Sequence, residues 1–524
     1  MISYPTFFRT GYSASARTGY SAFGHVDTSV VRVAAAFLRI DAAAFFVALV
    51  APVAGTALVA LVMLTAGTAF AQTTENPFPD PIAADEGVLV VDIAEFAQIP
   101  DIDGLPARMM RLVDEPGTGR LFVNSMQGMI YSVSYDGSEV ALYVDLNEWD
   151  VPVESGGRET GFQSFALHPD FANSGSAGYG HFYTYSDISD TAPEADFRPG
   201  GGDESHHTVL HEWVADDPAA AAYDGEAPRE LIRVEQPFGN HNAGHVAFNP
   251  LASPGDDDYG LLYIGSADGG SGGDPLNLAQ NLESAFGKLL RIDPLGSDSE
   301  NGSYGIPTNN PFVGTTGSAR GDALGEIYAY GMRNPQRFGW DPANGNLFLA
   351  DIGQNTVEKV TLVTPGANLG WNVWEGSFRY VGRDGVDVSD PRSDPEVTYP
   401  LVEFAHADPL TTGRSAVTGV HVFRGEAYPQ MQDRVLFADF VSGELLHFDA
   451  DNLPEGGNTG IRRMLLRKAD GETKTFLEII REKNEAQGRT PASRTDVRID
   501  AGPDDQVFLL NKQDGTIRRL VQGQ

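Results

Sequence analysis

Short apolar runs separated by turn residues recur along most of this chain. In each repeat an apolar segment enters a turn that contains Pro with Asp, Asn or Gly. A second segment rich in Leu, Tyr and Phe then follows. Short strands joined by hairpin turns, repeated over so long a chain, predict an all-β fold and a propeller in particular. The paired segments are residues 120–124 with 128–131, 165–170 with 181–185, 246–250 with 261–264, 338–342 with 347–351, 420–423 with 435–439, and 497–500 with 507–510.

Only residues 474–485 show a sustained helical pattern, and we expect this helix in a late insertion. The stretches 186–223 and 296–321 are rich in small and polar residues and are predicted to be long loops. The loop 253–260 carries three carboxylates, which suit Ca²⁺. A solvated acidic turn is the alternative interpretation.

The first 71 residues are predicted to be an export leader outside the fold. A nearly uncharged apolar run at 42–66 follows two arginines and precedes Ala-Phe-Ala at 69–71, which is typical of a signal peptide with a small-residue cleavage site. We therefore expect the mature chain to begin at Gln72 and to be periplasmic or extracellular. The run is also long enough to span a bilayer, so an uncleaved membrane anchor is the alternative.

Composition limits the remaining possibilities. Residues 72–99 are predicted to be a linker and 100–524 the propeller, a length that needs an architecture adding core by repeating units. The chain has 72 acidic and 36 basic residues, and its net charge of −36 excludes a nucleic acid as the natural partner. It has no cysteine, which excludes disulfides, thiolate chemistry and Cys-ligated metals.

Two segments, 239–270 and 330–336, carry the candidate chemistry. The first places His241 in a Gly- and Asn-rich turn before one predicted strand, and Asp268 follows the strand that pairs with it. A hairpin returns the carboxylate to the end of the sheet that holds the histidine. Asp268 is therefore expected to orient the His241 ring and to determine which nitrogen accepts a proton. The second segment offers Arg333 beside an amide on a Pro-terminated turn, a combination suited to polarising a carbonyl.

Other chemistry is less well supported by the residues. The Gly-rich run 265–273 has no helix after it and no ribose-binding acid, so NAD is not expected. Five histidines form a candidate zinc site, although they lack a ligand-spacing motif and packing is the plainer interpretation. These histidines are His206, His207, His211, His241 and His245. The tryptophans are expected to pack within or between blades, and an aromatic near Trp371 is a candidate stacking surface for a sugar or a planar cofactor.

In order and context these segments resemble the glucose/sorbosone dehydrogenase family, the soluble quinoprotein aldose dehydrogenases that carry pyrroloquinoline quinone (PQQ). The resemblance extends over roughly residues 100–520. It includes segments 161–171, 239–270, 281–293, 333–336, 350–355, 368–372 and 436–443. It implies a six-bladed β-propeller and a secreted enzyme that oxidises aldose sugars at C1 to lactones, with PQQ accepting the hydride.

The resemblance also implies roles for individual residues. His241 matches the family's general base, Asp268 the carboxylate that orients it, and Arg333 the cation beside the reactive quinone carbonyl. The implied cofactor contacts are Asn334, Gln336, Arg494 and Arg498, and the implied Ca²⁺ ligands are the main-chain carbonyls of Gly353 and Gln354.

The chain departs from the family at the cofactor carboxylates. Val441 stands where the best-known member has a lysine, and Arg494 and Arg498 match two family arginines only approximately in spacing. Two alternatives are therefore kept: a Ca²⁺-dependent propeller hydrolase such as a lactonase, and a non-catalytic propeller that binds carbohydrate or protein. The sequence specifies neither the sugar, nor the electron acceptor, nor the oligomeric state.

Overall fold

The computed structural model describes residues 72–522 except 158, 204–205, 383–384 and 412–413. The chain divides into two units, Met1–Gly67 and Thr68–Gln524. The predicted export leader, with its cleavage site and alternative anchor, lies outside the described residues. Within the described part, no helix is long and apolar enough to cross a membrane.

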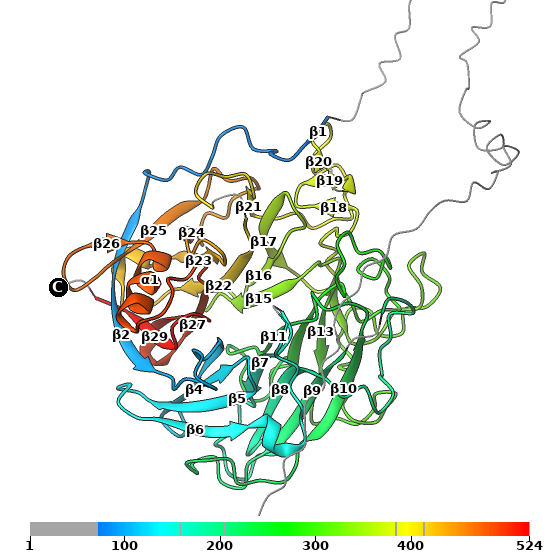
Figure 1. Ribbon diagram of the computed structural model, residues 1–524. Coiled ribbons are helices and arrows are strands. Elements are labelled where there is room, and N and C mark those ends of the chain that lie inside the picture. The colour runs from blue at the N-terminus through cyan, green and yellow to red at the C-terminus, as the bar shows by residue number, and fades with distance from the viewer. Residues whose placement is uncertain (1–71, 158, 204–205, 383–384, 412–413, 523–524) are drawn as a thin grey trace, which may run out of the picture. The chain divides into compact units, whose positions relative to one another are not determined.

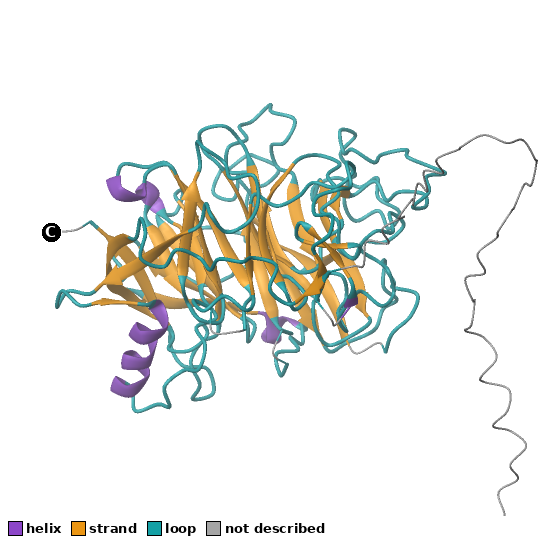
Figure 2. Cartoon of the chain, turned by 90° about the horizontal axis from the view of Figure 1, so that it is seen from above, coloured by secondary structure: helices purple, strands orange, loops and turns teal. Residues whose placement is uncertain are grey.

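Strands account for most of the regular structure, as Figure 2 shows, and this confirms the predicted β class. The described chain contains five antiparallel sheets of four strands, and it runs through four of them in order. Their strands are β3 (Met109–Glu115), β4 (Arg120–Ser125), β5 (Met129–Ser134) and β6 (Val140–Asp145); β7 (Phe162–Leu167), β8 (His181–Ile188), β9 (His206–Val214) and β10 (Arg229–Gln236); β11 (Ala243–Phe248), β12 (Leu262–Ser266), β13 (Lys288–Ile292) and β14 (Ile327–Tyr330); and β15 (Pro335–Trp340), β16 (Leu347–Asp351), β17 (Val357–Val363) and β21 (Val402–Ala405).

A nine-stranded sheet joins the two ends of the described chain. Its strands are β22 (Val417–Phe423), β23 (Arg434–Asp439), β24 (Leu445–Asp449), β25 (Arg462–Arg467), β2 (Leu89–Gln98), β29 (Thr516–Val521), β28 (Val507–Leu510) and β27 (Arg498–Ala501), with β26 (Thr473–Lys474) beside β25. The N-terminal strand β2 pairs antiparallel with β29 and parallel with β25. Residues 89–98 therefore belong to the sheet and not to the predicted linker, because Val91, Ile93 and Ala97 alternate into its core.

The remaining elements are small. A further sheet of short strands contains β1 (Thr73–Thr74), β20 (Val386–Asp387), β19 (Phe378–Tyr380) and β18 (Trp374–Glu375). The 3₁₀ helices are η1 (Leu146–Trp149), η3 (Pro429–Met431) and η4 (Pro503–Asp505). The helix α1 (Phe476–Ala486) confirms the helical prediction for 474–485. It begins two residues later than predicted because Thr475 is its N-cap and forms a capping box with Glu478.

The strands fall into successive groups, and the first strand of each group packs against the first strand of the next in a closed ring. β3 contacts β7, β7 contacts β11, β11 contacts β15, β15 contacts β22, β22 contacts β27, and β27 returns to β3. In Figure 1 these strands lie nearest the centre and the later strands of each group lie farther out. Loops from different groups therefore meet at the ends of the ring, although they are far apart in sequence.

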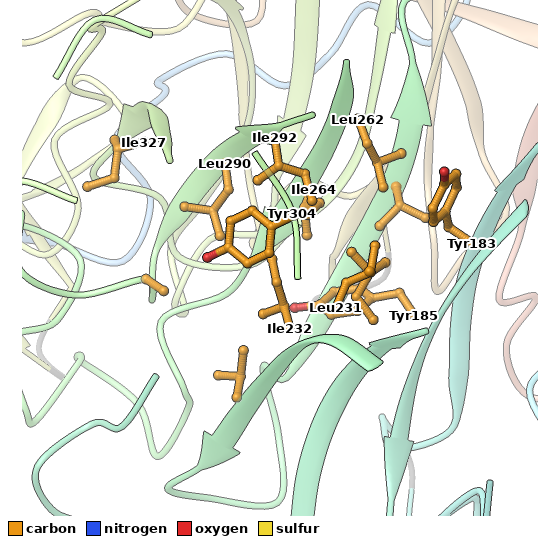
Figure 3. Packing of buried hydrophobic residues seen from close by; sticks show 14 of the residues in the cluster. Tyr183, Tyr185, Leu231, Ile232, Leu262, Ile264, Leu290, Ile292, Tyr304 and Ile327 are labelled. Atoms are coloured by element: carbon orange, nitrogen blue, oxygen red, sulfur yellow. The ribbon is translucent and has the colours of Figure 1, made fainter. Parts of the chain in front are cut away.

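Apolar side chains fill the space between neighbouring sheets. In one large cluster, Tyr183 of β8 and Leu231 of β10 pack against Leu262 and Ile292 of the next sheet (Figure 3). Tyr304, from the predicted loop 296–321, is also buried in this cluster. The spaces between sheets are thus the cores that hold the groups together.

The two predicted long loops differ in outcome. Residues 296–321 contain no named strand, as expected. Within 186–223, however, β8 extends to Ile188 and β9 occupies His206–Val214, so this prediction is wrong in part. Residues on both faces of β9 are buried, so this part of the stretch belongs to the core of the sheet and not to a surface loop.

Candidate functional site

A cavity of about 780 Å³ opens among loops from several strand groups. Eight of the nine predicted site residues line it, namely His241, Arg333, Asn334, Gln336, Gly353, Gln354, Arg494 and Arg498. The ninth, Asp268, lies behind His241 and is bonded to its ring. The structure therefore brings together every residue that the sequence singled out for this site.

The common location follows from strand direction. His241 precedes β11, Arg333 precedes β15, and Gly353 follows β16. In an antiparallel hairpin the start of one strand and the end of the next lie at the same edge of the sheet. Because β11 also packs against β15, the two hairpins present these loops to one shared cavity.

The buried His241 ring is held by a charged partner. Its Nδ1 lies 2.8 Å from Oδ1 of Asp268. The other oxygen of Asp268 accepts a hydrogen bond of 2.8 Å from Nε1 of Trp371, and the Gly270 N–H donates to Oδ1. Burial alone would raise the pKa of the Asp268 carboxyl, but His241, Arg333 and Gly270 together hold it below its ordinary value. An ionised carboxylate only accepts hydrogen bonds, so Nδ1 of His241 carries the proton and Nε2 is the basic nitrogen.

The backbone of His241 is also unusual. Its φ of 53° lies in the left-handed region, which residues other than Gly adopt uncommonly, although Asn, Asp and His do so more often than the rest. The His241 N–H donates to Oε2 of Glu159 at 2.9 Å, and Glu159 itself lines the cavity. The strained conformation is thus anchored by a carboxylate from the segment before β7, one that the sequence did not single out.

Arg333 and Asn334 are positioned through their main chain. Both N–H groups donate to the buried carboxylate of Asp351, which also pairs with Lys359 at 3.0 Å. The Arg333 side chain donates from Nε to Oε1 of Gln354 at 3.2 Å. Its guanidinium also lies 5.8 Å from the ring of Trp371, against the cavity. A rigid cation is therefore fixed on the same side of the cavity as His241.

The loop that carries Gly353 and Gln354 is organised by one buried carboxylate. Oε1 of Glu375 accepts the N–H groups of Gln354, Asn355, Thr356 and Val357 at 2.8, 3.1, 2.8 and 3.0 Å. In a trans peptide the carbonyl of one residue points opposite to the N–H of the next. The carbonyl oxygens of Gly353 and Gln354 consequently point away from Glu375, as backbone ligands of a hard cation must.

A second buried carboxylate supports the same loop. Glu358 accepts the N–H of Gly353 and lies 2.6 Å from Nε2 of His406, which reaches the cavity. Burial by itself would lower the pKa of His406, but Glu358 outweighs it and raises that pKa. Two fully buried acids thus lie behind the carbonyls of the loop, and their negative charge favours a cation in front of them.

The C-terminal side of the cavity is basic. Arg498 is fully buried, and burial lowers its pKa to about 10. Arg494 is more exposed and pairs with Asp496 at 2.5 Å. Both guanidinium groups lie over the ring of Phe440, whose neighbour Val441 also lines the cavity. This arrangement suits an anionic ligand with a planar body.

The alternative sites have less structural support. Within the described ranges, no three His, Asp or Glu side chains are grouped so as to hold a metal ion, a search that does not test main-chain ligands. His206, His207 and His211 are buried in β9 and do not line the cavity. Trp371 is fully buried and holds Asp268, so it is a support for the site and not an exposed stacking surface.

The sequence missed several residues of the cavity and its supports. Glu159, His406, Phe440 and Lys512 line the cavity. Glu375 lies under the loop that carries Gly353 and Gln354, which we call the carbonyl loop. Each comes from a segment with no local catalytic pattern. The only signals in the sequence were a carboxylate in the Gly-rich segment before β7 and single basic residues in turns. Such residues occur at many other positions of the chain, so they do not single out a site.

Comparison with known proteins identifies relatives of this chain. The family model for glucose/sorbosone dehydrogenase matches residues 106–519. The HIPL1 protein of Arabidopsis thaliana is 29% identical over 370 residues, which are 63% of this chain and 50% of that protein. The aldose sugar dehydrogenase YliI of Escherichia coli is 25% identical over 221 residues, which are 42% of this chain and 51% of that protein. This chain therefore spans about half the length of the curated relatives it matches.

A solved structure shares the fold. The PQQ-bound form of the aldose sugar dehydrogenase from Streptomyces coelicolor superposes with a TM-score of 0.51 at 19% identity, covering 82% of this chain and 98% of that one. At this identity the likeness concerns the fold alone. With the family model matching most of its length, the chain belongs to the glucose/sorbosone dehydrogenase family.

Proposed function

We propose that this protein is a PQQ- and Ca²⁺-dependent dehydrogenase that oxidises aldose sugars at C1 to lactones. The observation that carries the proposal is the 2.8 Å contact between His241 Nδ1 and Asp268 Oδ1, placed in a cavity that Arg333 also lines. Such an oxidation needs a base for the C1 hydroxyl and positive charge where the acceptor becomes anionic, and these three residues supply both.

His241 acts as the general base. Its Nε2 takes the proton of the C1 hydroxyl, while Nδ1–H keeps its bond to Asp268. Asp268 positions the ring and stabilises the imidazolium that forms, and Trp371 and Gly270 hold the carboxylate in place. Arg333 directs its guanidinium toward the developing negative charge.

The residues present fit both the cofactor and the metal. PQQ supplies the acceptor for the C1 hydride, and it is an anion with three carboxylates. Asn334, Gln336, Arg494 and Arg498 would hold it in the cavity. The carbonyls of Gly353 and Gln354 would hold Ca²⁺, because Glu375 turns them away from itself.

The same proposal extends to architecture and location. The closed ring of first strands supports a six-bladed propeller, in which β2 completes the last blade beside β29. The blades would be β3–β6, β7–β10, β11–β14, β15–β17 with β21, β22–β25, and β27–β29 with β2.

The apolar run at 42–66 supports export to the periplasm or beyond, where an electron acceptor still to be identified would reoxidise the cofactor.

The test is reconstitution. Purified apoprotein is incubated with PQQ and Ca²⁺, and dye reduction is followed with glucose and then with other aldoses. Reduction that requires PQQ, Ca²⁺ and sugar together is the expected result. Bound PQQ without reduction by any aldose would favour a non-catalytic propeller, and cofactor-independent hydrolysis of a lactone would favour the hydrolase.

A further inference from the structure

Three cations surround one aromatic ring at the C-terminal side of the cavity. The guanidinium carbons of Arg494 and Arg498 lie 4.9 and 4.4 Å from the centre of the Phe440 ring, and Nζ of Lys512 lies 5.5 Å from it. All four residues line the cavity, and we call them the Phe440 cluster. Lys512 follows β28, far in sequence from Phe440 and outside the segments that carry the family resemblance at this site.

Lys512 differs from every other lysine of the chain. All six lysines lie among the described residues, and five of them have a carboxylate or carbonyl partner. These pairs are Lys288 with the carbonyls of Leu278, Ala279 and Phe286, Lys359 with Asp351, Lys468 with Asp470, Lys474 with Glu472, and Lys483 with Glu95. In the described part of the chain, the Lys512 ammonium lies against the Phe440 ring and has no carboxylate or carbonyl partner.

The cluster holds more positive charge than its neighbours neutralise. Asp496 pairs with Arg494 at 2.5 Å, whereas the buried Arg498 donates to the Thr418 hydroxyl and the Val497 carbonyl. Within the described residues no carboxylate lies within ion-pair distance of Arg498 or Lys512. One carboxylate thus faces three cations, and burial together with Arg498 lowers the pKa of Lys512.

The whole cavity shows the same imbalance. Its described lining contains six Lys or Arg side chains and two carboxylates, although the chain as a whole carries a net charge of −36. The six are Arg108, Arg333, Arg414, Arg494, Arg498 and Lys512, and the two are Glu159 and Asp496. An excess of cations over carboxylates in one cavity costs free energy, which a bound anion offsets.

On the basis of the proposed function, we propose that Lys512, together with Arg498, binds a carboxylate of the cofactor and supplies the cation that the best-known member of the family has at the position of Val441. Val441 lines the cavity beside Phe440 and is apolar, so position 441 contributes no charge to the cavity wall. Lys512 reaches the same ring from the turn between β28 and β29, so the chain places its lysine in a different loop and keeps it on the same side of the cavity.

The experiment measures PQQ binding and does not depend on turnover. The full chain, its K512Q and K512R variants and a K468Q control are titrated with PQQ in Ca²⁺, with tryptophan fluorescence quenching as the readout. Lys468 is a matched control because its partners are Asp470 and Glu482, away from the cavity. K512Q should bind PQQ about tenfold to hundredfold more weakly, as expected for a lost charge-assisted hydrogen bond, and with a shallower salt dependence.

The controls separate the possible outcomes. K512R keeps a cation and should stay within about threefold of the parent affinity, and K468Q should match the parent. Melting curves show whether each variant is folded. A folded K512Q that binds PQQ as tightly as the parent overturns the assignment of Lys512 and leaves the proposed function standing. A parent chain that binds no PQQ overturns both.

Discussion

At the scale of single residues, the site depends on one histidine held in a strained conformation. Glu159 accepts the main-chain N–H of His241, Asp268 lies against its Nδ1, and the residue lines the cavity. Backbone strain of this kind costs of the order of 1–3 kcal/mol and persists where surrounding contacts determine the conformation. The cost is consistent with a ring whose position matters for chemistry.

Replacing His241 with Gln should lower turnover by about two orders of magnitude or more, the usual effect of losing a general base. PQQ affinity should survive, because the cofactor contacts come from other residues. Turnover is measured by dye reduction and affinity by fluorescence titration. Dye reduction at near-parent rates by this variant would remove the proposed role of His241.

Replacing Asp268 with Asn should lower turnover less than loss of the histidine. The amide oxygen still accepts the bond from Nδ1, but the negative charge that stabilises imidazolium is gone. Steady-state rates over a range of pH distinguish this from a purely structural effect, since losing the charge makes imidazolium less stable and displaces the pH profile toward lower pH. An unchanged profile with a lowered rate would argue that Asp268 only supports the fold.

At the scale of elements, the informative unit is the loop between β16 and β17. Its N–H groups converge on Glu375 in β18, which belongs to a different sheet. Oε2 of Glu375 is buried and has no hydrogen-bond partner within the described chain. A Cβ at Gly353 would overlap the carbonyl oxygen of Val357, so this turn needs glycine. The loop is therefore shaped by the β18 segment and not by its own residues alone.

The E375Q variant should bind Ca²⁺ about tenfold to hundredfold more weakly, because it keeps an acceptor oxygen for the loop but removes a buried negative charge. Calorimetric titration of the apoprotein measures the affinity. An E396Q variant is the control, since Glu396 is an exposed acid with only a 3.5 Å contact to Arg320. Parent-like Ca²⁺ affinity in E375Q would place the metal elsewhere.

At the scale of the whole molecule, the N-terminal strand closes the structure. β2 lies between β25 and β29 and buries Val91 and Ile93 in the core that joins the two ends of the sheet. Burying one large aliphatic side chain stabilises a fold by about 1.5–3 kcal/mol. Closure by a distant strand thus contributes a sizeable part of a typical stability of about 5–15 kcal/mol.

A chain that begins at residue 100 should therefore melt at least about 10 °C lower than one that begins at Gln72, or fail to fold. Thermal unfolding followed by circular dichroism compares the two. The chain that begins at Gln72 is the control, because it retains both β1 and β2. Equal melting temperatures would show that 72–99 act as a linker after all.

Removing Ca²⁺ with a chelator should abolish activity and leave the circular dichroism spectrum nearly unchanged. The carbonyl loop is held by Glu375 and Glu358, and the sheets have extensive cores of their own, so the fold does not need the metal. Both readouts are taken at one chelator concentration, with excess Ca²⁺ added back as the control. Loss of the β spectrum would show that the metal is structural.

The amino-acid sequence by itself determined what depends on short-range pattern. Alternating apolar residues and turn signals located the hairpins, and a hairpin necessarily returns Asp268 to the end that holds His241. The Arg333 segment also lies at a strand end, whereas the role of Gly353, at the end of β16, was implied only by the family resemblance. The alternation of apolar and polar residues locates strands and their ends, and this signal is strong even over a few residues.

Only the tertiary structure decided which distant segments share the cavity. The pairing of β2 with β29 joins residues more than 400 positions apart, and no local pattern specifies such a partner. The same holds for Glu375 beneath the carbonyl loop, and for Lys512 at the Phe440 ring. Their roles arise because closing the ring brings loop ends together, and that proximity follows from the packing of whole sheets and not from the identity of neighbouring residues.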